Sequence, residues 1–408
     1  CRRSTSIKTS SSPAVRDAAG SGQGNRMKIM AEKIVVKRPA KDAANSNAQT
    51  GSGTVAGAQG ARDAEPSERN KTTAAAPAPA KRRKLYVHIG MHKTGTTSIQ
   101  YALNDNYLSM MNLGYHVPMA GRDPRHFVQH SLLASVFTQA YAAKLGDGAE
   151  VDRRTIVDAI RMEIRSAGKP NIIISSESLW HYKKDEITAF AAAFSDYDIE
   201  PVLFIRSLAD YIDGLAGTMI AHNFFSEEEI RRNRDSLWTS HASLSVSDAA
   251  IQWASVAHDK KIWIENYDVS GDLDSVQAFA EIIGVEPSKL VSRFGDVNKS
   301  LPVPLTYMKF ELIARGVSAE NADFLVKNLS KLKFGKNYSL LTPEFRLEVL
   351  KKYSQMFARI AEEGIAKTRN GQPITYSKRI DEPKRQVQGL SGVLFEIGNA
   401  VAAQLRTI

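Results

Sequence analysis

The chain has 408 residues, of which 43% are hydrophobic, enough for one large α/β domain or two average domains. Its only cysteine is Cys1, which excludes an internal disulfide framework and a cysteine-based metal site, and favours a cytoplasmic protein. The formal net charge of +10 lies in residues 1–84, which carry 17 Lys and Arg against 6 Asp and Glu, so the rest of the chain is nearly neutral. We therefore expect no nucleic-acid-binding face on the folded part, and no apolar run is long enough to predict a transmembrane helix.

Composition divides the chain into three parts. Residues 1–83 are rich in Ala, Ser, Gly, Pro and basic side chains and almost lack aromatic residues, which predicts a disordered basic tail. Residues 84–380 are expected to form the folded domain. Residues 381–408 are expected to form a helical extension, with an amphipathic closing helix over Gly389–Leu405.

Four short apolar runs predict buried strands in the folded part. They cover residues 85–90, 171–175, 200–205 and 261–264, with helix-compatible stretches between them, the first from Thr97 through Leu113. Strands that alternate with helices pair in parallel through right-handed crossovers. We expect a three-layer α/β fold of the P-loop type, with a central parallel sheet of four to five strands flanked by helices. From Leu305 onward the pattern is mainly helical.

A phosphate-binding loop is predicted where the first strand turns into the first helix. Gly90 and Gly95 have the spacing of a Walker loop and Thr97 occupies its hydroxyl position, but the lysine position holds Thr96 and the cation is Lys93. Backbone N–H groups and the helix dipole converge at such a turn and attract an anion. An ordinary NTPase needs its lysine on the β- and γ-phosphates beside Mg²⁺, so this loop suits a ligand without a γ-phosphate.

The segment His-Ile-Gly-Met-His-Lys-Thr-Gly-Thr-Thr-Ser, residues 88–98, resembles the 5′-phosphosulfate loop of the P-loop sulfotransferase family, particularly its bacterial members. The resemblance extends from Leu85 to about Tyr376. It implies transfer of a sulfuryl group from 3′-phosphoadenylyl sulfate to an acceptor hydroxyl. Lys93 would contact the oxygen that bridges phosphate and sulfate. The backbone and hydroxyl donors of Thr94, Gly95, Thr96, Thr97 and Ser98 would hold the 5′-phosphate.

The same resemblance implies roles for residues after the second and third strands. Glu177 matches the position of the general base, which would accept the proton of the acceptor hydroxyl; the other interpretation is an acid that favours a helix N-terminus capped by Ser176 or Ser178. Arg206 matches the arginine that holds the 3′-phosphate, or it forms an ion pair. The family has a serine eight residues later, where this chain has Gly214, and Ser207 or Thr218 would have to compensate.

Weaker matches follow. Tyr267 would lie near the adenine or in the core. Lys299, within Asn298-Lys299-Ser300-Leu301, would add charge at the 3′-phosphate. His126 and His130 are expected to cap or pack a helix rather than to bind an acceptor. No His, Asp and Glu spacing predicts a metal site, and the implied reaction needs no metal.

The sequence thus predicts a sulfotransferase whose partner is a small-molecule or glycan acceptor, with a carbohydrate or glycolipid favoured by the bacterial resemblance. Two alternatives stay open. One is a nucleotide kinase with a drifted P-loop, which would depend on Mg²⁺. The other is a non-catalytic anion-binding scaffold, which the Gly214 departure favours.

Overall fold

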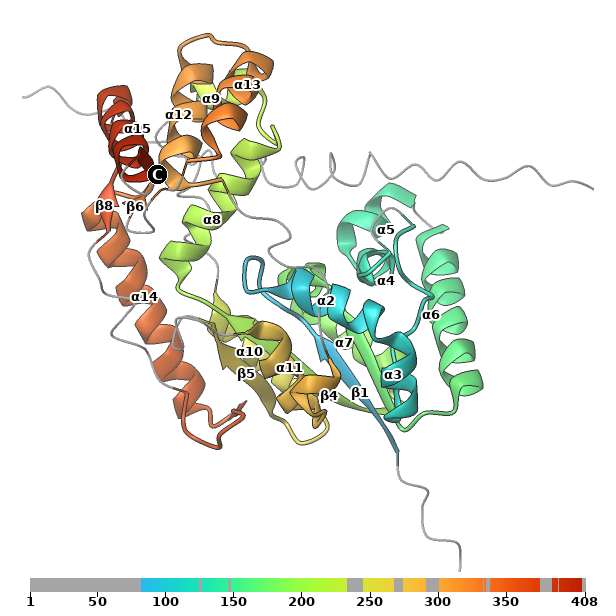
Figure 1. Cartoon of the computed structure of the whole chain (residues 1–408). Coiled ribbons are helices and arrows are strands. Elements are labelled where there is room, and N and C mark those ends of the chain that lie inside the picture. The colour runs from blue at the N-terminus through green and yellow to red at the C-terminus, as the bar shows by residue number, and fades with distance from the viewer. Residues whose placement is uncertain are drawn as a thin grey trace, which may run out of the picture. The chain divides into compact units, whose positions relative to one another are not determined.

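The computed structural model describes residues 82–124, 127–145, 148–232, 245–267, 274–290, 301–332, 334, 338–374, 384–387 and 389–405 (Figure 1). They lie within one compact unit, Arg82–Ile408. The expected tail up to residue 81, His126, the segment Asn298-Lys299-Ser300 and Tyr376 lie outside the described residues.

A parallel sheet organises this unit. Its strands are β1 (Arg83–His88), β2 (Tyr115–His116), β3 (Asn171–Ser175), β4 (Tyr197–Ile205), β5 (Ile262–Asn266) and β7 (Ala366–Lys367), in the order β2-β3-β1-β4-β5-β7. Every neighbouring pair in this sheet is parallel. The α/β class with a parallel sheet is confirmed. The sheet has six strands rather than four or five, because two-residue strands extend both edges, and such short pairings leave no periodic signal in a sequence.

Helices cover both faces of the sheet and make three layers, as expected. Successive strand residues point to opposite faces, so Tyr86 joins one apolar cluster with Ile99 and Phe279, whereas Leu85 and Val87 join the other. The first cluster includes side chains of α2 (Thr96–Asp105), α3 (Tyr107–Asn112) and α11 (Ser275–Ile283). The second includes those of α4 (Ser131–Val136), α6 (Gly148–Ala167), α7 (Lys184–Ala193), α8 (Leu208–Ala221), α10 (Val246–Val256) and α14 (Pro343–Glu362).

The helix expected from Thr97 through Leu113 is interrupted. Asn106 has φ −102° and ψ 19° and separates α2 from α3. Its side-chain Nδ2 donates to the Ala102 carbonyl at 2.8 Å. Asparagine side chains compete in this way for backbone groups of a helix, which is a local reason for the break.

The C-terminal part is mainly helical, as expected. It contains α12 (Val303–Ala314), α13 (Ala319–Leu329), α14 and α15 (Gly389–Leu405), together with a small parallel pair of β6 (Tyr338–Ser339) and β8 (Arg385–Gln386). The remaining elements are α5 (Gln139–Leu145), α9 (Glu227–Arg232) and the 3₁₀ turns η1 (Glu177–His181) and η3 (Pro287–Lys289). A helix over Gly389–Leu405 is therefore present. No helix in the described ranges combines the length and apolar character needed to cross a bilayer.

Candidate active site

The order of the sheet gathers the predicted site residues at one edge. The chain runs from β1 to β2 and back to β3 on one side of β1, and then crosses to β4 on the other side. The carboxyl ends of β1, β3 and β4 are followed by the loop with Lys93, by Glu177 and by Arg206, respectively. A crevice at such a topological switch point is where open α/β sheets bind ligands. These side chains, separated by up to 113 residues in sequence, therefore share one site.

The loop from Gly90 to Gly95 is shaped for close approach of an anion. Lys93 and Gly95 both have positive φ, 67° and 81°, and Gly95 is the N-cap of α2, whose first turn holds no acidic residue. A Cβ at Gly90 would lie 2.7 Å from Thr96 Oγ1 and 2.8 Å from His88 Nε2. Only glycine therefore fits there without displacing a neighbour, and the positive end of α2 is left for a bound anion.

Two of the predicted hydroxyl donors brace the loop instead of facing outward. Thr94 and Thr96 are buried, and their hydroxyls donate to the Met91 carbonyl at 2.6 and 3.4 Å. They would therefore serve a phosphate through their backbone N–H groups. Thr97 and Ser98, in the first turn of α2, are half-buried.

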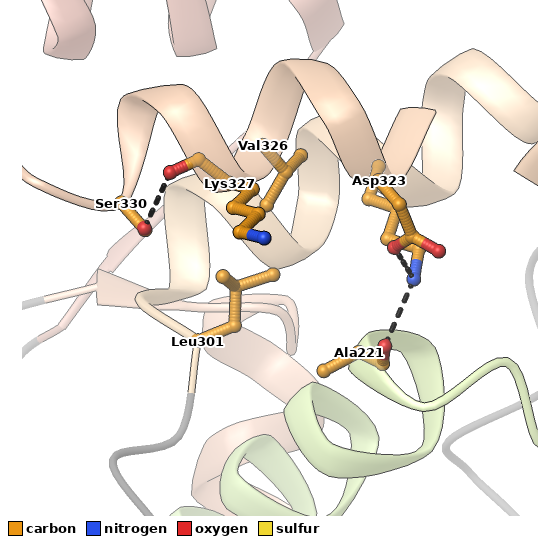
Figure 2. A pocket seen from close by; sticks show the side chains of 7 residues that line it. Ala221, Leu301, Asp323, Val326, Lys327 and Ser330 are labelled. Carbon is orange, nitrogen blue, oxygen red and sulfur yellow. Dashed lines mark hydrogen bonds and ion pairs between the residues drawn. The ribbon is translucent and has the colours of Figure 1, made fainter. Parts of the chain in front are cut away.

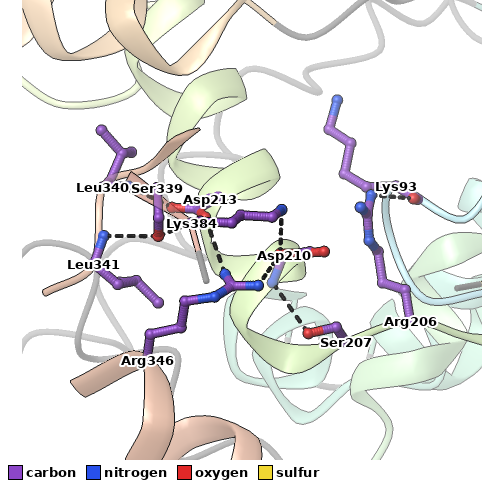
Figure 3. Close-up of polar contacts among 10 residues, drawn as sticks. All are labelled: Lys93, Arg206, Ser207, Asp210, Asp213, Ser339, Leu340, Leu341, Arg346 and Lys384. Atoms are coloured by element: carbon purple, nitrogen blue, oxygen red, sulfur yellow. Dashed lines mark hydrogen bonds and ion pairs between the residues drawn. The ribbon is translucent and has the colours of Figure 1, made fainter. Parts of the chain in front are cut away.

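Lys93 and Arg206 form a cationic pair beside the loop (Figure 3). The Arg206 Nη1 donates to the Lys93 carbonyl at 2.8 Å, and its Nε is buried without a hydrogen-bond partner in the described part of the chain. Burial lowers the pKa of the Lys93 ammonium, the Arg206 charge lowers it further, and the Glu177 carboxylate opposes both effects. Lys93 and Arg206 are two cations whose pairing within the described residues is incomplete, and the planar guanidinium of Arg206 can bind an oxyanion through two N–H groups. Together they suit a phosphate-bearing ligand.

Tyr267 and Gly214 complete the surroundings of Arg206. The Tyr267 ring lies under the guanidinium, 5.6 Å from ring centroid to Cζ, and beside Gly95. A Cβ at Gly214 would lie 3.4 Å from Lys93 Cγ and 4.0 Å from Arg206 Nη1. The position eight residues after Arg206 therefore faces the cationic pair, although this chain has no side chain there.

The two residues considered as substitutes for a hydroxyl at Gly214 have other contacts. The Ser207 hydroxyl caps α8 and accepts from the Asp210 N–H at 3.5 Å. The Thr218 hydroxyl donates to the Gly214 carbonyl at 3.0 Å. Neither contact is directed to Arg206.

Glu177 is the first residue of η1, and Ser176 is its N-cap, with its hydroxyl accepting from the Ser178 N–H. The capping interpretation is thus observed, and the carboxylate has a further partner. Glu177 Oε2 accepts a hydrogen bond from His92 Nδ1. Burial raises the pKa of the Glu177 carboxyl, but the His92 hydrogen bond, together with electrostatic attraction from His92, His88 and Lys93, outweighs it and holds the pKa below its usual range. The carboxylate is therefore ionised at neutral pH, as a general base requires.

His88 and His130 are buried side chains that contact Ser175 at the end of β3. His130 is buried; its Nε2 donates to the Pro118 carbonyl at 2.8 Å, and its Nδ1 accepts from the Ser175 N–H at 3.1 Å. His88 Nδ1 lies 2.9 Å from the Ser175 hydroxyl. Burial lowers the pKa of His88 to about 4 and that of His130 to about 3. The packing role expected for His130 matches this position.

Helix α8, which follows Arg206, is fixed by a buried ionic cluster (Figure 3). Arg346 Nη2 and Lys384 Nζ both donate to Asp210 Oδ1, at 2.9 and 2.7 Å. Asp213 accepts from the Ser339 hydroxyl at 2.9 Å, and burial raises its pKa to about 6. The cluster connects α8 to α14, β6 and the start of β8.

Two residues that the structure brings to the site had no role predicted from the sequence. His92 binds Glu177, and Ser275, at the start of α11, donates to the Gly95 carbonyl at 3.4 Å. Being next to Lys93 was the only signal for His92 in the sequence. Ser275 is 180 residues from the loop, so no local pattern identifies it.

A hollow of about 230 Å³ lies elsewhere, where α12 and α13 meet the end of α8 (Figure 2). Its Lys309 is fully buried, donates to the Ala221 carbonyl at 3.0 Å and pairs with Asp323. Its charge is neutralised internally, and none of the predicted site residues lines it. Among the described residues, no group of three or more His, Cys, Asp and Glu is arranged to hold a metal ion.

Comparisons with known proteins place few constraints on this chain. No family model and no curated protein matches it. Among solved structures, a sulfotransferase from Alicyclobacillus acidocaldarius aligns at 12% identity with a TM-score of 0.33, over 62% of this chain and 96% of that one. At this level of similarity the geometry of the site must carry the functional argument.

Proposed function

We propose that this chain is a sulfotransferase that moves a sulfuryl group from 3′-phosphoadenylyl sulfate to an acceptor hydroxyl. One observation carries the proposal: Lys93, Glu177 and Arg206 follow the carboxyl ends of three adjacent parallel strands. A cation on a phosphate loop and an ionised carboxylate from the neighbouring strand are what a direct transfer between two oxygens requires.

The residues present fit this donor. A side chain at Gly90 would overlap Thr96 Oγ1 and His88 Nε2, so glycine alone permits this tight turn, and Arg206 Nε is a buried donor still without a partner among the described residues. The Lys93 ammonium would stabilise the charge that develops on the leaving phosphate oxygen. Arg206 would bind the 3′-phosphate, and Tyr267, under its guanidinium, would lie beside the nucleotide. The backbone N–H groups from Thr94 to Ser98 would hold the 5′-phosphate.

Glu177 would receive the proton of the acceptor hydroxyl as that oxygen attacks sulfur. The sulfur–oxygen bond to the leaving phosphate breaks as the new sulfur–oxygen bond forms, so no covalent enzyme intermediate is needed. Since His92, with His88 and Lys93, lowers the pKa of Glu177, the carboxylate is ready to accept this proton at neutral pH. We expect the acceptor to be a carbohydrate or glycolipid hydroxyl, and 3′-phosphoadenylyl sulfate labelled in its sulfuryl group, offered with a panel of such acceptors, tests this.

The donor site is tested by calorimetric titration of 3′-phosphoadenosine 5′-phosphate into the wild type and Lys93→Ala. We expect the variant to bind at least about tenfold more weakly, since hydrogen bonds to charged groups contribute about 1.5 kcal/mol or more. Lys327→Ala, in the hollow of Figure 2, is the matched control and should bind like the wild type.

Each rival function has its own outcome in the same titration. Preference for ATP–Mg²⁺ over the bisphosphate would indicate a kinase, and absence of bisphosphate binding would refute the donor site. Tight binding without transfer of labelled sulfate to any acceptor, water included, would indicate an anion-binding scaffold. Glu177→Gln should retain bisphosphate affinity and lose transfer.

A further inference from the structure

His92 links the phosphate loop to the proposed base. It occupies the loop position immediately before Lys93, and its Nδ1 donates to Glu177 Oε2. The contact is partly shielded from water, because the two side chains are 29% and 23% exposed. A charge-assisted hydrogen bond in such surroundings is stronger than an exposed surface pair. The Glu177 carboxylate, which follows β3, is therefore held by a residue of the loop that follows β1.

His92 is itself fixed by the end of η1. Its Nε2 lies 3.4 Å from His181 Nε2, and the two rings are 5.5 Å apart between centroids. His181 in turn contacts the ring of Trp180, which is 4% exposed. The imidazole is thus braced against the core of the domain, and its orientation toward Glu177 is defined.

The hydrogen-bond pattern assigns the protons. Because Glu177 is ionised, His92 Nδ1 carries the hydrogen of their contact, and His92 Nε2 faces His181. One carboxylate oxygen, Oε2, is occupied by the imidazole. No described residue forms a hydrogen bond with the other oxygen, Oε1, which is therefore available to receive the proton of an incoming hydroxyl.

We propose that His92 is a positioning residue for the transfer reaction, holding the Glu177 carboxylate so that Oε1 points to the acceptor oxygen, opposite the Lys93 ammonium. This inference rests on the proposed function. In the reaction, the acceptor O–H bond breaks and its proton goes to Glu177 Oε1, while sulfur exchanges its bond to the leaving phosphate oxygen for a bond to the acceptor oxygen. His92 touches none of these atoms and acts through Glu177.

Other charged or titratable groups also affect the pKa of Glu177, so the test must distinguish the effect of His92 from theirs. Glu177 interacts electrostatically with residues of β1, of the loop and of α8, and η1 itself contributes one imidazole. The groups that interact with Glu177 are His88, Lys93 and Tyr211, whereas His181 of η1 contacts His92. Within the described part of the chain, only His92 gives the carboxylate a hydrogen bond, so substitutions at this position isolate the contact.

The test compares His92→Asn with His92→Phe. Asparagine places an N–H donor near the Nδ1 position but cannot be charged, whereas phenylalanine keeps the ring and removes the donor. The probe reaction is release of sulfate from 3′-phosphoadenylyl sulfate with water as the acceptor, measured against pH. Affinity for 3′-phosphoadenosine 5′-phosphate is measured in parallel, and we expect it to change less than about threefold in both variants, because neither substitution alters Lys93 or Arg206.

Loss of the His92 contact raises the pKa of Glu177 toward its usual range, so the acid limb of the rate profile should move to higher pH. We expect about a tenfold lower rate on the acid limb in His92→Phe, and a smaller loss in His92→Asn. A merely structural role would lower the rate at all pH values without moving the limb. Unchanged limbs in both variants, with bisphosphate binding retained, would overturn the inference.

A second measurement needs no turnover. In protein labelled with ¹⁵N-histidine, the Nδ1–H of His92 should give a downfield proton resonance that disappears in His92→Asn and moves upfield in Glu177→Gln. Absence of this resonance from the wild type would overturn the inference by itself. Failure of the wild type to bind the bisphosphate would instead refute the proposed function, and the two failures are therefore distinguishable.

Discussion

The structure predicts that Gly214→Ser increases the affinity for 3′-phosphoadenosine 5′-phosphate. Gly214 lies in the interior of α8, and a Cβ there would meet Lys93 Cγ at 3.4 Å, Lys93 Cβ at 3.7 Å and Arg206 Nη1 at 4.0 Å. These are ordinary van der Waals distances, and the nearest atoms belong to a flexible lysine side chain. A serine therefore fits without displacing backbone, and its hydroxyl would lie beside the guanidinium proposed to hold the 3′-phosphate.

The expected magnitude follows from the added hydrogen bond. A hydrogen bond to a charged group contributes about 1.5 kcal/mol in excess of its cost, which corresponds to about a tenfold lower dissociation constant. Replacing a glycine within a helix also stabilises the folded protein, by up to about 1 kcal/mol for alanine. Gly214→Ala is the matched control, because it adds the Cβ and the helix propensity without the hydroxyl.

Calorimetric titration of 3′-phosphoadenosine 5′-phosphate into the wild type, Gly214→Ser and Gly214→Ala measures the effect. We expect Gly214→Ser to bind about tenfold more tightly than Gly214→Ala, and the latter to bind like the wild type. Adenosine 5′-phosphate, which lacks the 3′-phosphate, should bind all three proteins alike. Equal affinities of the serine and alanine variants for the bisphosphate would refute the placement of the 3′-phosphate at Arg206 beside Gly214.

Two further perturbations test the supports of the site. Gly95→Ala should lower the free energy of unfolding in urea by about 2 kcal/mol, because Gly95 has φ 81° and an added Cβ would overlap Ser275 Oγ. The control is Gly392→Ala in α15, which should be neutral or stabilising, since a Cβ there meets nothing within 4 Å. Burial lowers the pKa of His88 to about 4 and of His130 to about 3 from 6.5. The folded state thus binds protons less readily than the unfolded state, and the stability due to these two residues is present above pH 6.5 and is lost as pH falls toward 3. His130→Gln should weaken the pH dependence of unfolding between pH 6.5 and 4, and an unchanged dependence would contradict the buried, neutral state of His130.

The main strands were predictable because each depends on its own residues. Three of the four central strands lie within two residues of the apolar runs that predicted them, and β3 coincides with its run at Asn171–Ser175. The break at Asn106 was not predicted, because the helical pattern continues across it and a single side-chain contact decides it. The edge strands β2 and β7 have two residues each, and they exist only because a longer strand lies beside them.

The candidate site, too, has one part that could be predicted from the sequence and another that only the structure shows. The sequence by itself determined the loop for which we propose phosphate binding, since its glycines, hydroxyls and Lys93 are contiguous and the turn that they form needs only local backbone conformations. It also placed Glu177 and Arg206 at strand ends. Only the tertiary structure decided that Glu177 accepts from His92, 85 residues away, and that Gly214 faces Arg206 and Lys93. Such contacts depend on strand order and helix packing, which arise from the combined burial of many side chains and not from any one segment.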